Sequence, residues 1–250
     1  MDQMRDVNKN LHAEYMMLIN RTEINEEDVE VILTPDGNQP TEAHFLIRLA
    51  VDFSKLPKKH IVVNDTAAVL HVTFRAPHWA RSNAELHLSE NLHEVFSNFN
   101  NIQLSSISLQ KPLMVVVPEV KRMLNDKIDS ILMAFEKKSA FISAVICHQS
   151  GSVIEYDSID FNYVIILLEQ CDFHFLVHFN LPQNFPDQPP RVTLQSVYFM
   201  SGKHEVYKHV IDGIPYSPRW EPAKMYSKAI GTIMTREVNR FKNNSTKHHR

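Results

Sequence analysis

Cysteine is nearly absent from this sequence, which carries only Cys147 and Cys171 in 250 residues and has no Cys-x-x-Cys pair. A disulfide-stapled scaffold is therefore excluded, and the composition fits a reducing compartment. Glycine is also scarce, at five residues, and the sequence has neither a low-complexity tract nor a repeat of solenoid length. With so few breaks, the organisation of the chain must be inferred from its hydrophobic periodicity.

Long apolar runs and an excess of positive charge are missing too. The longest uninterrupted apolar run covers 163–168, whereas a membrane-spanning helix needs about 20 such residues. The polar start, Met1-Asp2-Gln3, does not fit a signal peptide. Lys and Arg number 26 against 29 Asp and Glu, a net charge of −3, so no basic field would hold a nucleic-acid backbone. The sequence predicts a soluble intracellular protein that binds neither membranes nor nucleic acid.

Apolar residues make up 44% of the chain, enough to bury a core in each of one or two domains. In the first half, the helical spacing of apolar residues predicts an amphipathic helix over 7–19. Strands rich in β-branched or aromatic residues are predicted at 29–33, 45–53 and 69–74. The turn-forming sequence Pro35-Asp36-Gly37-Asn38 separates the first two strands. We predict that this unit ends at residue 112.

The second unit, 113–250, opens with a long helix predicted to begin at Pro118, a residue favoured in a first helical turn. Its apolar stripe recurs at steps of three and four residues and consists of Val120, Leu124, Ile128, Ile131, Leu132 and Phe135. Strands are predicted at 153–156, 161–168, 173–181 and 191–197, and a closing helix over 225–241 with frayed residues from 243 onward. Both units are therefore predicted to be α+β, each an antiparallel meander with flanking helices. The lysines in Lys121-Arg122 and Lys137-Lys138 are predicted to lie on a solvated helix face.

A proline-rich turn, Leu181-Pro182-Gln183-Asn184-Phe185-Pro186-Asp187-Gln188-Pro189-Pro190-Arg191-Val192, precedes the last predicted strand. Prolines fix φ and remove a backbone donor where a chain leaves one strand and enters another. The order of helix, meander and proline turn resembles the ubiquitin-conjugating fold. Active members carry a catalytic cysteine after this strand, beside a His-Pro-Asn segment, and 198–220 contains neither. Because thioester chemistry needs a thiolate, the resemblance implies a catalytically inactive variant of the UEV class rather than an enzyme.

Further segments resemble the brain and reproductive organ-expressed (BRE) protein family. They are FLIRLAVDFS at 45–54, VIEYD at 153–157, FLVHFNLP at 175–182, QSVY at 195–198 and PYSPRW at 215–220. The resemblance implies two UBC/RWD-like (UEV) domains, a middle one over 1–112 and a C-terminal one over 113–250. Family members usually carry an additional N-terminal UEV-like domain, which is not part of this sequence.

The same resemblance implies a non-catalytic scaffold subunit of a BRISC- or BRCA1-A-type deubiquitinase complex that cleaves lysine-sixty-three-linked polyubiquitin. The scaffold would link an MPN-type zinc deubiquitinase and its inactive, Abraxas-like MPN partner to a MERIT40-like von Willebrand A adaptor, in the cytoplasm and the nucleus. The family's C-terminal domain accepts a short adaptor tail containing proline and arginine, and a proline-rich ligand loses little entropy on binding. Direct binding of polyubiquitin stays open. An alternative is a UEV-type peptide- or ubiquitin-binding adaptor of endosomal sorting. No cofactor is expected.

Catalysis by a cysteine is a further alternative, but Cys147 and Cys171 are better explained as residues without a catalytic role. An active conjugating enzyme would have to use Cys147 or Cys171, and both precede the proline turn. Cys147 and His148 are neighbours, and adjacent residues on a helix point about 100° apart, so they do not form a nucleophile and base. No catalytic residue is predicted.

Metal-like histidine spacings occur without the geometry that a metal requires. Cys171, His174 and His178 are spaced like ligands, but on a strand the cysteine would face away from both histidines. His204 and His209 nearly match the His-Glu-x-x-His motif, yet on a helix their five-residue spacing turns them roughly 140° apart. None of the 14 histidines forms the His-x-His pair of MPN deubiquitinases. We predict no metal site, so any zinc chemistry belongs to a partner.

The candidate partner-binding residues are Phe185, Tyr198, Tyr216, Pro218, Arg219 and Trp220. Tyr, Trp and Arg dominate the energetics of interfaces, which favours a binding loop at 215–220. The alternative is a packed turn in which Trp220 is buried against the C-terminal helix. Phe185 is predicted mainly to determine the fold, while its ring could also line a peptide groove.

Overall fold

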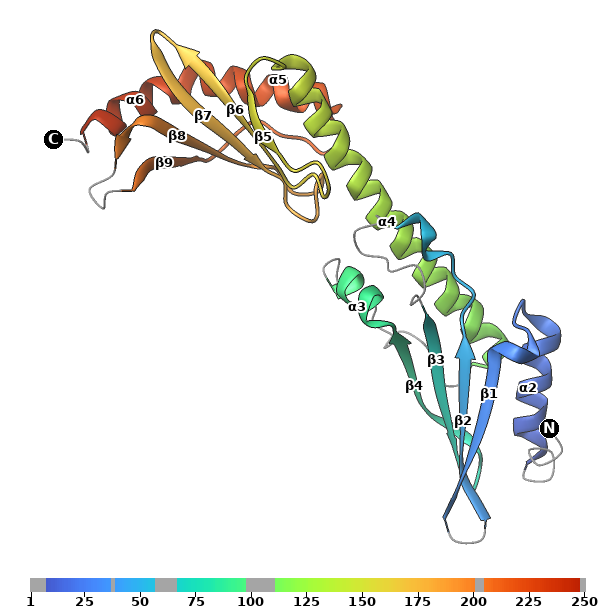
Figure 1. Ribbon diagram of the computed structural model, residues 1–250. Helices are drawn as coiled ribbons and strands as arrows, with labels where there is room; N and C mark the ends of the chain where they lie inside the picture. Colours follow the sequence, from blue (N-terminus) through green and yellow to red (C-terminus); the bar gives the residue numbers. More distant parts are fainter. Residues whose placement is uncertain (1–7, 37–38, 57–66, 98–110, 201–204, 248–250) are drawn as a thin grey trace. The chain divides into compact units, whose positions relative to one another are not determined.

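The structure, a computed structural model, describes residues 8–36, 39–56, 67–97, 111–200 and 205–247 (Figure 1). The chain divides into two compact units, 1–132 and 133–250. Each unit has its own antiparallel sheet and its own hydrophobic core. The prediction of an α+β chain with two antiparallel sheets is therefore confirmed. In the described ranges, no helix combines the length and the apolar character that a membrane crossing requires.

Unit 1 is built on a four-stranded meander, with its strands in sequence order across the sheet. The strands are β1 (Val29–Asp36), β2 (Gln39–Arg48), β3 (Ala68–Arg75) and β4 (Ala80–Leu88). The helical elements are α2 (Lys9–Arg21), η1 (Glu26–Asp28), η2 (Phe53–Lys55), α3 (Glu90–Ser97) and the first part of α4 (Leu113–His148).

The core of unit 1 lies between one face of this sheet and the helices. Phe45 and Leu70 are fully buried on the sheet, and Leu18 of α2 and Val120 of α4 belong to the same core. On the other face, His71 is only partly buried and Thr73 is the buried exception on β3. The alternation has the period of two expected for a sheet with one solvated side.

Helix boundaries in unit 1 follow local capping. Helix α2 begins two residues later than predicted because the Asn8 side chain accepts hydrogen bonds from the backbone N–H groups of Asn10 and Leu11. The prediction that the long helix begins at Pro118 is wrong. Helix α4 begins at Leu113, whose backbone N–H donates to Glu14 Oε2 at 2.9 Å, and Pro118 lies inside it.

Two strand predictions in unit 1 need correction. The strand predicted over 45–53 ends at Arg48, because Asp52 Oδ1 accepts the Ser54 backbone N–H at 3.0 Å and starts a 3₁₀ turn. Phe53 is still buried, but it reaches the core from this turn. Strand β4 was not predicted, since its sequence ARSNAELHL has only weak alternation. Gly37 and Asn38, in the predicted hairpin turn, lie outside the described residues.

Unit 2 is built on a five-stranded meander, again in sequence order. Its strands are β5 (Val153–Tyr156), β6 (Tyr163–Gln170), β7 (Phe173–Asn180), β8 (Arg191–Met200) and β9 (Val206–Ile211). The end of α4, helix α5 (Pro222–Thr232), the π-helical segment η5 (Ile233–Glu237) and helix α6 (Val238–Lys247) complete it.

Aromatic side chains dominate the core of unit 2. Alternate residues of β7 from Phe173 to Phe179 are buried, as the sequence predicts. From α4, Phe141 packs edge to face against Phe179 and Phe185, with ring centroids 5.8 and 5.6 Å away. Phe185 belongs to the proline turn, so this turn packs directly against the core.

The structure differs from the expectations for unit 2 at the closing helix and at Lys138. Residues 206–211 form strand β9, which was not predicted, so the helical geometry used to compare His204 with His209 does not apply, and His204 lies outside the described residues. The closing helix continues to Lys247, with Ser245 fully buried, instead of fraying from residue 243. Lys138 is buried, not solvated, and its Nζ donates to Asn162 Oδ1 at 2.8 Å.

Candidate partner-binding site

The loop 215–220 is attached to the proline turn by Tyr216. The Tyr216 hydroxyl donates a hydrogen bond to the backbone carbonyl of Pro186, and its ring centroid lies 6.5 Å from that of Phe185. Phe185 itself is only 1% exposed. Its ring is not available to a partner, which favours its interpretation as a fold determinant.

Trp220 closes the other end of the loop. Its ring packs partly against the core of unit 2, and Lys224 Nζ, in the first turn of α5, lies 5.4 Å from the ring centroid. The Trp220 backbone N–H donates to Ser217 O at 3.1 Å, which makes the segment a tight turn. Between the two aromatic anchors, Pro218 and Arg219 are exposed. The two aromatic residues therefore pack as in the packed-turn alternative, while Pro218 and Arg219 face solvent.

Tyr198 does not belong to this loop. It lies near the end of β8, seven residues beyond the strand's first residue, Arg191, or roughly 20 Å along an extended chain. It is 53% exposed, and its hydroxyl lies 2.9 Å from Nδ1 of His174. Exposed apolar side chains near it in sequence or across the β8–β9 pairing are Val197, Met200 and Val206. Tyr198 therefore marks a second, apolar surface of unit 2.

The two cysteines occupy different places in unit 2, and both are exposed. Cys147 lies in the last turn of α4, where the neighbouring His148 directs Nδ1 to the Ala144 carbonyl at 2.7 Å. Cys171 lies in the β6–β7 turn at φ 51°, so the expectation that it lies on a strand is wrong. His174 bonds to Tyr198, and the pKa of His178 is lowered by burial and then by Lys208. The spacing of Cys171 and these histidines thus reflects separate local contacts.

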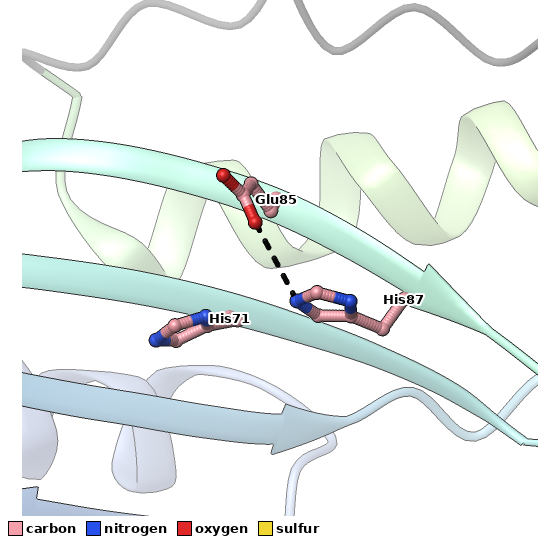
Figure 2. Close-up of side chains that lie close together, drawn as sticks. All are labelled: His71, Glu85 and His87. Atoms are coloured by element: carbon pink, nitrogen blue, oxygen red, sulfur yellow. Dashed lines mark ion pairs between the residues drawn. The ribbon is translucent and has the colours of Figure 1, made fainter.

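The sequence analysis missed a cluster of three potential metal ligands in unit 1, His71, Glu85 and His87 (Figure 2). The pKa of His71 is lowered by burial and by the neighbouring His44 and His87. The Glu-x-His pair on β4 has the spacing that puts two side chains on one face of a strand. That signal is useful only once 80–88 is recognised as a strand next to β3.

Tyr216 makes the attachment of the loop sensitive to alkaline pH. Burial, followed by the Asp187 carboxylate, raises its pKa from 10.0 to about 12. A pKa raised in the folded state means that the contribution of Tyr216 to stability is complete below pH 10 and is lost as the pH rises toward 12. We expect Tyr216→Phe to lower the free energy of unfolding by about 1 kcal/mol at pH 8 and to weaken the loss of stability between pH 10 and 12.

Urea denaturation at a series of pH values measures this effect. Tyr156→Phe is the matched control, because Tyr156 is an exposed tyrosine of the same unit. Identical pH profiles for wild type and Tyr216→Phe would show that the hydroxyl does not support the loop.

A profile of the family described as brain and reproductive organ-expressed protein (BRE) matches residues 1–200. The chain belongs to this family. The match covers unit 1 and unit 2 through the end of β8, and the loop 215–220 lies beyond the matched range.

Curated BRE relatives carry the name "BRISC and BRCA1-A complex member 2". The protein of Danio rerio is 31% identical over 194 residues, which are 75% of this chain and 50% of the relative. The protein of Branchiostoma floridae is 32% identical over 209 residues, 81% of this chain and 54% of the relative. This BRE-family chain therefore spans about half the length of the curated relatives that it matches.

Proposed function

We propose that this chain is a non-catalytic scaffold subunit of a deubiquitinase complex of the BRISC or BRCA1-A type. The observation that carries the proposal is membership of the BRE family, whose curated relatives are named as members of these complexes. The complex cleaves lysine-sixty-three-linked polyubiquitin through another subunit and works in the cytoplasm and the nucleus.

In this proposal, unit 1 and unit 2 are each built on a UBC/RWD-like (UEV) domain. The domain boundary predicted from the sequence, between 1–112 and 113–250, lies at the start of α4, and the first part of this helix packs in the core of unit 1. The second is supported by the order of α4, the antiparallel strands β5 to β8 and the proline turn with Phe185 in the core. The first is supported by its own antiparallel meander with flanking helices.

The positions of the cysteines support a role without catalysis. Both Cys147 and Cys171 precede β8, while the nucleophile of a conjugating enzyme follows the corresponding strand. Within the part of the chain that the structure describes, neither thiol is hydrogen-bonded to an acidic or basic side chain. Their exposure in a helix end and a strand turn is that of ordinary surface thiols.

The scaffold links an MPN-type zinc deubiquitinase and its inactive, Abraxas-like partner to a MERIT40-like adaptor. The loop 215–220 receives the extended adaptor tail, since Pro218 and Arg219 face solvent from a turn that Tyr216 and Trp220 hold in place. An anchored loop loses little conformational entropy when a peptide binds. The apolar surface around Tyr198 offers a separate contact for a larger partner.

Affinity purification of the tagged full chain from an animal cell line tests the proposal. Both MPN subunits and the MERIT40-like adaptor are expected to co-purify, with quantitative mass spectrometry comparing them with a tag-only control. Recovery of endosomal sorting factors in place of the MPN subunits would overturn the proposal in favour of a sorting adaptor.

The control for catalysis is incubation of the purified chain with ubiquitin-activating enzyme, ATP and ubiquitin. No reducible thioester is expected. A ubiquitin adduct that is lost on reduction and on Cys147→Ser or Cys171→Ser replacement would contradict the non-catalytic assignment.

A further inference from the structure

A row of histidines crosses the solvated face of the sheet in unit 1. His44 lies on β2, His71 on β3 and His87 on β4, so three adjacent strands each contribute one imidazole. The antiparallel register pairs His71 directly with Glu85, and His87 follows Glu85 on the same face of β4. Directly opposed residues on one sheet face have Cβ atoms about 4.5–5.5 Å apart, so this register brings the side chains together.

The side chains of His71, Glu85 and His87 converge (Figure 2). Their potential ligand atoms all lie within 4.8 Å of one another, and Glu85 Oε2 is 3.7 Å from His87 Nε2. In a tetrahedral zinc site with bonds of about 2.0–2.1 Å, ligand atoms are roughly 3.3 Å apart. Because Glu85 and His87 are exposed, small rotations of their side chains bring the three atoms to this spacing.

His44 supports this arrangement from the neighbouring strand. Its Nδ1 lies 3.1 Å from Nε2 of His71, and Thr73 Oγ1 lies within 3.4 Å of both atoms. In Figure 2, one ring nitrogen of His71 points toward Glu85 and His87, and the other points away. Metal-binding histidines typically donate their second ring N–H to a nearby acceptor, which fixes the tautomer and the ring orientation. His44 Nδ1 is placed to be that acceptor.

We propose that His71, Glu85 and His87 form a binding site for one divalent transition-metal ion, with Zn²⁺ the best match to two imidazoles and a carboxylate. Water completes the coordination, since the cluster lies on the solvated face. His44 is a positioning residue that orients His71. The bound ion ties β3 to β4, and β4 is an edge strand of the sheet. The site is independent of the loop 215–220 and of the scaffold role.

Calorimetric titration of the chelator-treated full chain with Zn²⁺ tests this site. The adjacent His248 and His249 are competing ligands, so every variant is made in a His248→Ala, His249→Ala background. One site is expected in that background, and His71→Ala and His87→Ala are each expected to weaken Zn²⁺ binding by at least about tenfold. His93→Ala, which removes an exposed histidine of α3 in the same unit, is expected to leave the affinity unchanged.

Two further measurements separate a site from a folding defect. Circular dichroism establishes that each variant is folded, and Zn²⁺ is expected to raise the melting temperature of the background chain but not that of His87→Ala. His44→Ala is expected to weaken binding less than His71→Ala does. Equal Zn²⁺ affinity in the background, His71→Ala and His87→Ala proteins, or loss of affinity in His93→Ala alone, would overturn the proposal.

Discussion

Replacement of Phe141 by alanine is expected to lower the free energy of unfolding of unit 2 by about 3–5 kcal/mol. Phe141 is 0% exposed and contacts Phe179 on the sheet and Phe185 in the proline turn. The substitution removes both edge-to-face contacts and leaves a cavity that the aromatic neighbours fill only in part. Because a domain is stable by only about 5–15 kcal/mol, this is a large share of the total.

Tryptophan fluorescence during guanidinium denaturation measures the loss of stability of unit 2. The chain has two tryptophans, Trp79 in unit 1 and Trp220 in unit 2, so a Trp79→Phe background leaves Trp220 as the reporter. Met133→Ala is the matched control, since Met133 is a large apolar residue of the same helix that is 61% exposed. A loss in Phe141→Ala no greater than in this control would show that the aromatic cluster does not support unit 2.

The strands with strict alternation could be predicted from sequence. In β7 the alternate residues from Phe173 to Phe179 are apolar, and three of these four are followed by His or Asn, so the sequence period agrees with the observed burial. Strands β4 and β9 were not predicted. The sequence of β4 is mostly polar, and β9 is only six residues long and has a single buried residue, Ile211, so neither shows a clear period of two.

The division of α4 between two cores could not be predicted from periodicity. Val120 and Ile131 belong to the core of unit 1, while Phe141 and Val145 belong to that of unit 2. An apolar stripe tells which side of a helix is buried but not which sheet covers it. The burial of Lys138 has a similar origin, because its partner Asn162 is supplied by a loop 24 residues away.

The sequence shows that the loop 215–220 contains residues typical of an interface, but it does not show which of them pack against the core and which face solvent. Aromatic residues and arginine favour an interface wherever they occur. The contact that decides their roles joins the Tyr216 hydroxyl to the Pro186 carbonyl, 30 residues apart in sequence. That contact makes Tyr216 an anchor and leaves Arg219 as the residue able to reach a ligand.

Replacement of Arg219 by alanine is accordingly expected to weaken binding of the adaptor tail about thirtyfold, or roughly 2 kcal/mol. An extended, proline-containing peptide has backbone carbonyls without internal partners. The exposed guanidinium of Arg219 has five N–H donors in a planar fork that can bind such carbonyls. Arg219→Lys keeps the charge but loses the fork, so its expected affinity lies between those of wild type and Arg219→Ala. Fluorescence anisotropy with a labelled peptide of the adaptor tail measures all three.

The matched control is Arg236→Ala, which removes an exposed arginine of η5 in the same unit and is expected to change the affinity by less than about 0.5 kcal/mol. Arg219→Ala leaves both aromatic anchors in place, so a loss of binding cannot be attributed to an unfolded loop, as it could after replacement of Trp220. Retention of full affinity in Arg219→Ala would remove the loop from the proposed interface. The apolar surface around Tyr198 would then be the next site to test, because it combines an exposed aromatic residue with the exposed apolar side chains of Val197 and Met200.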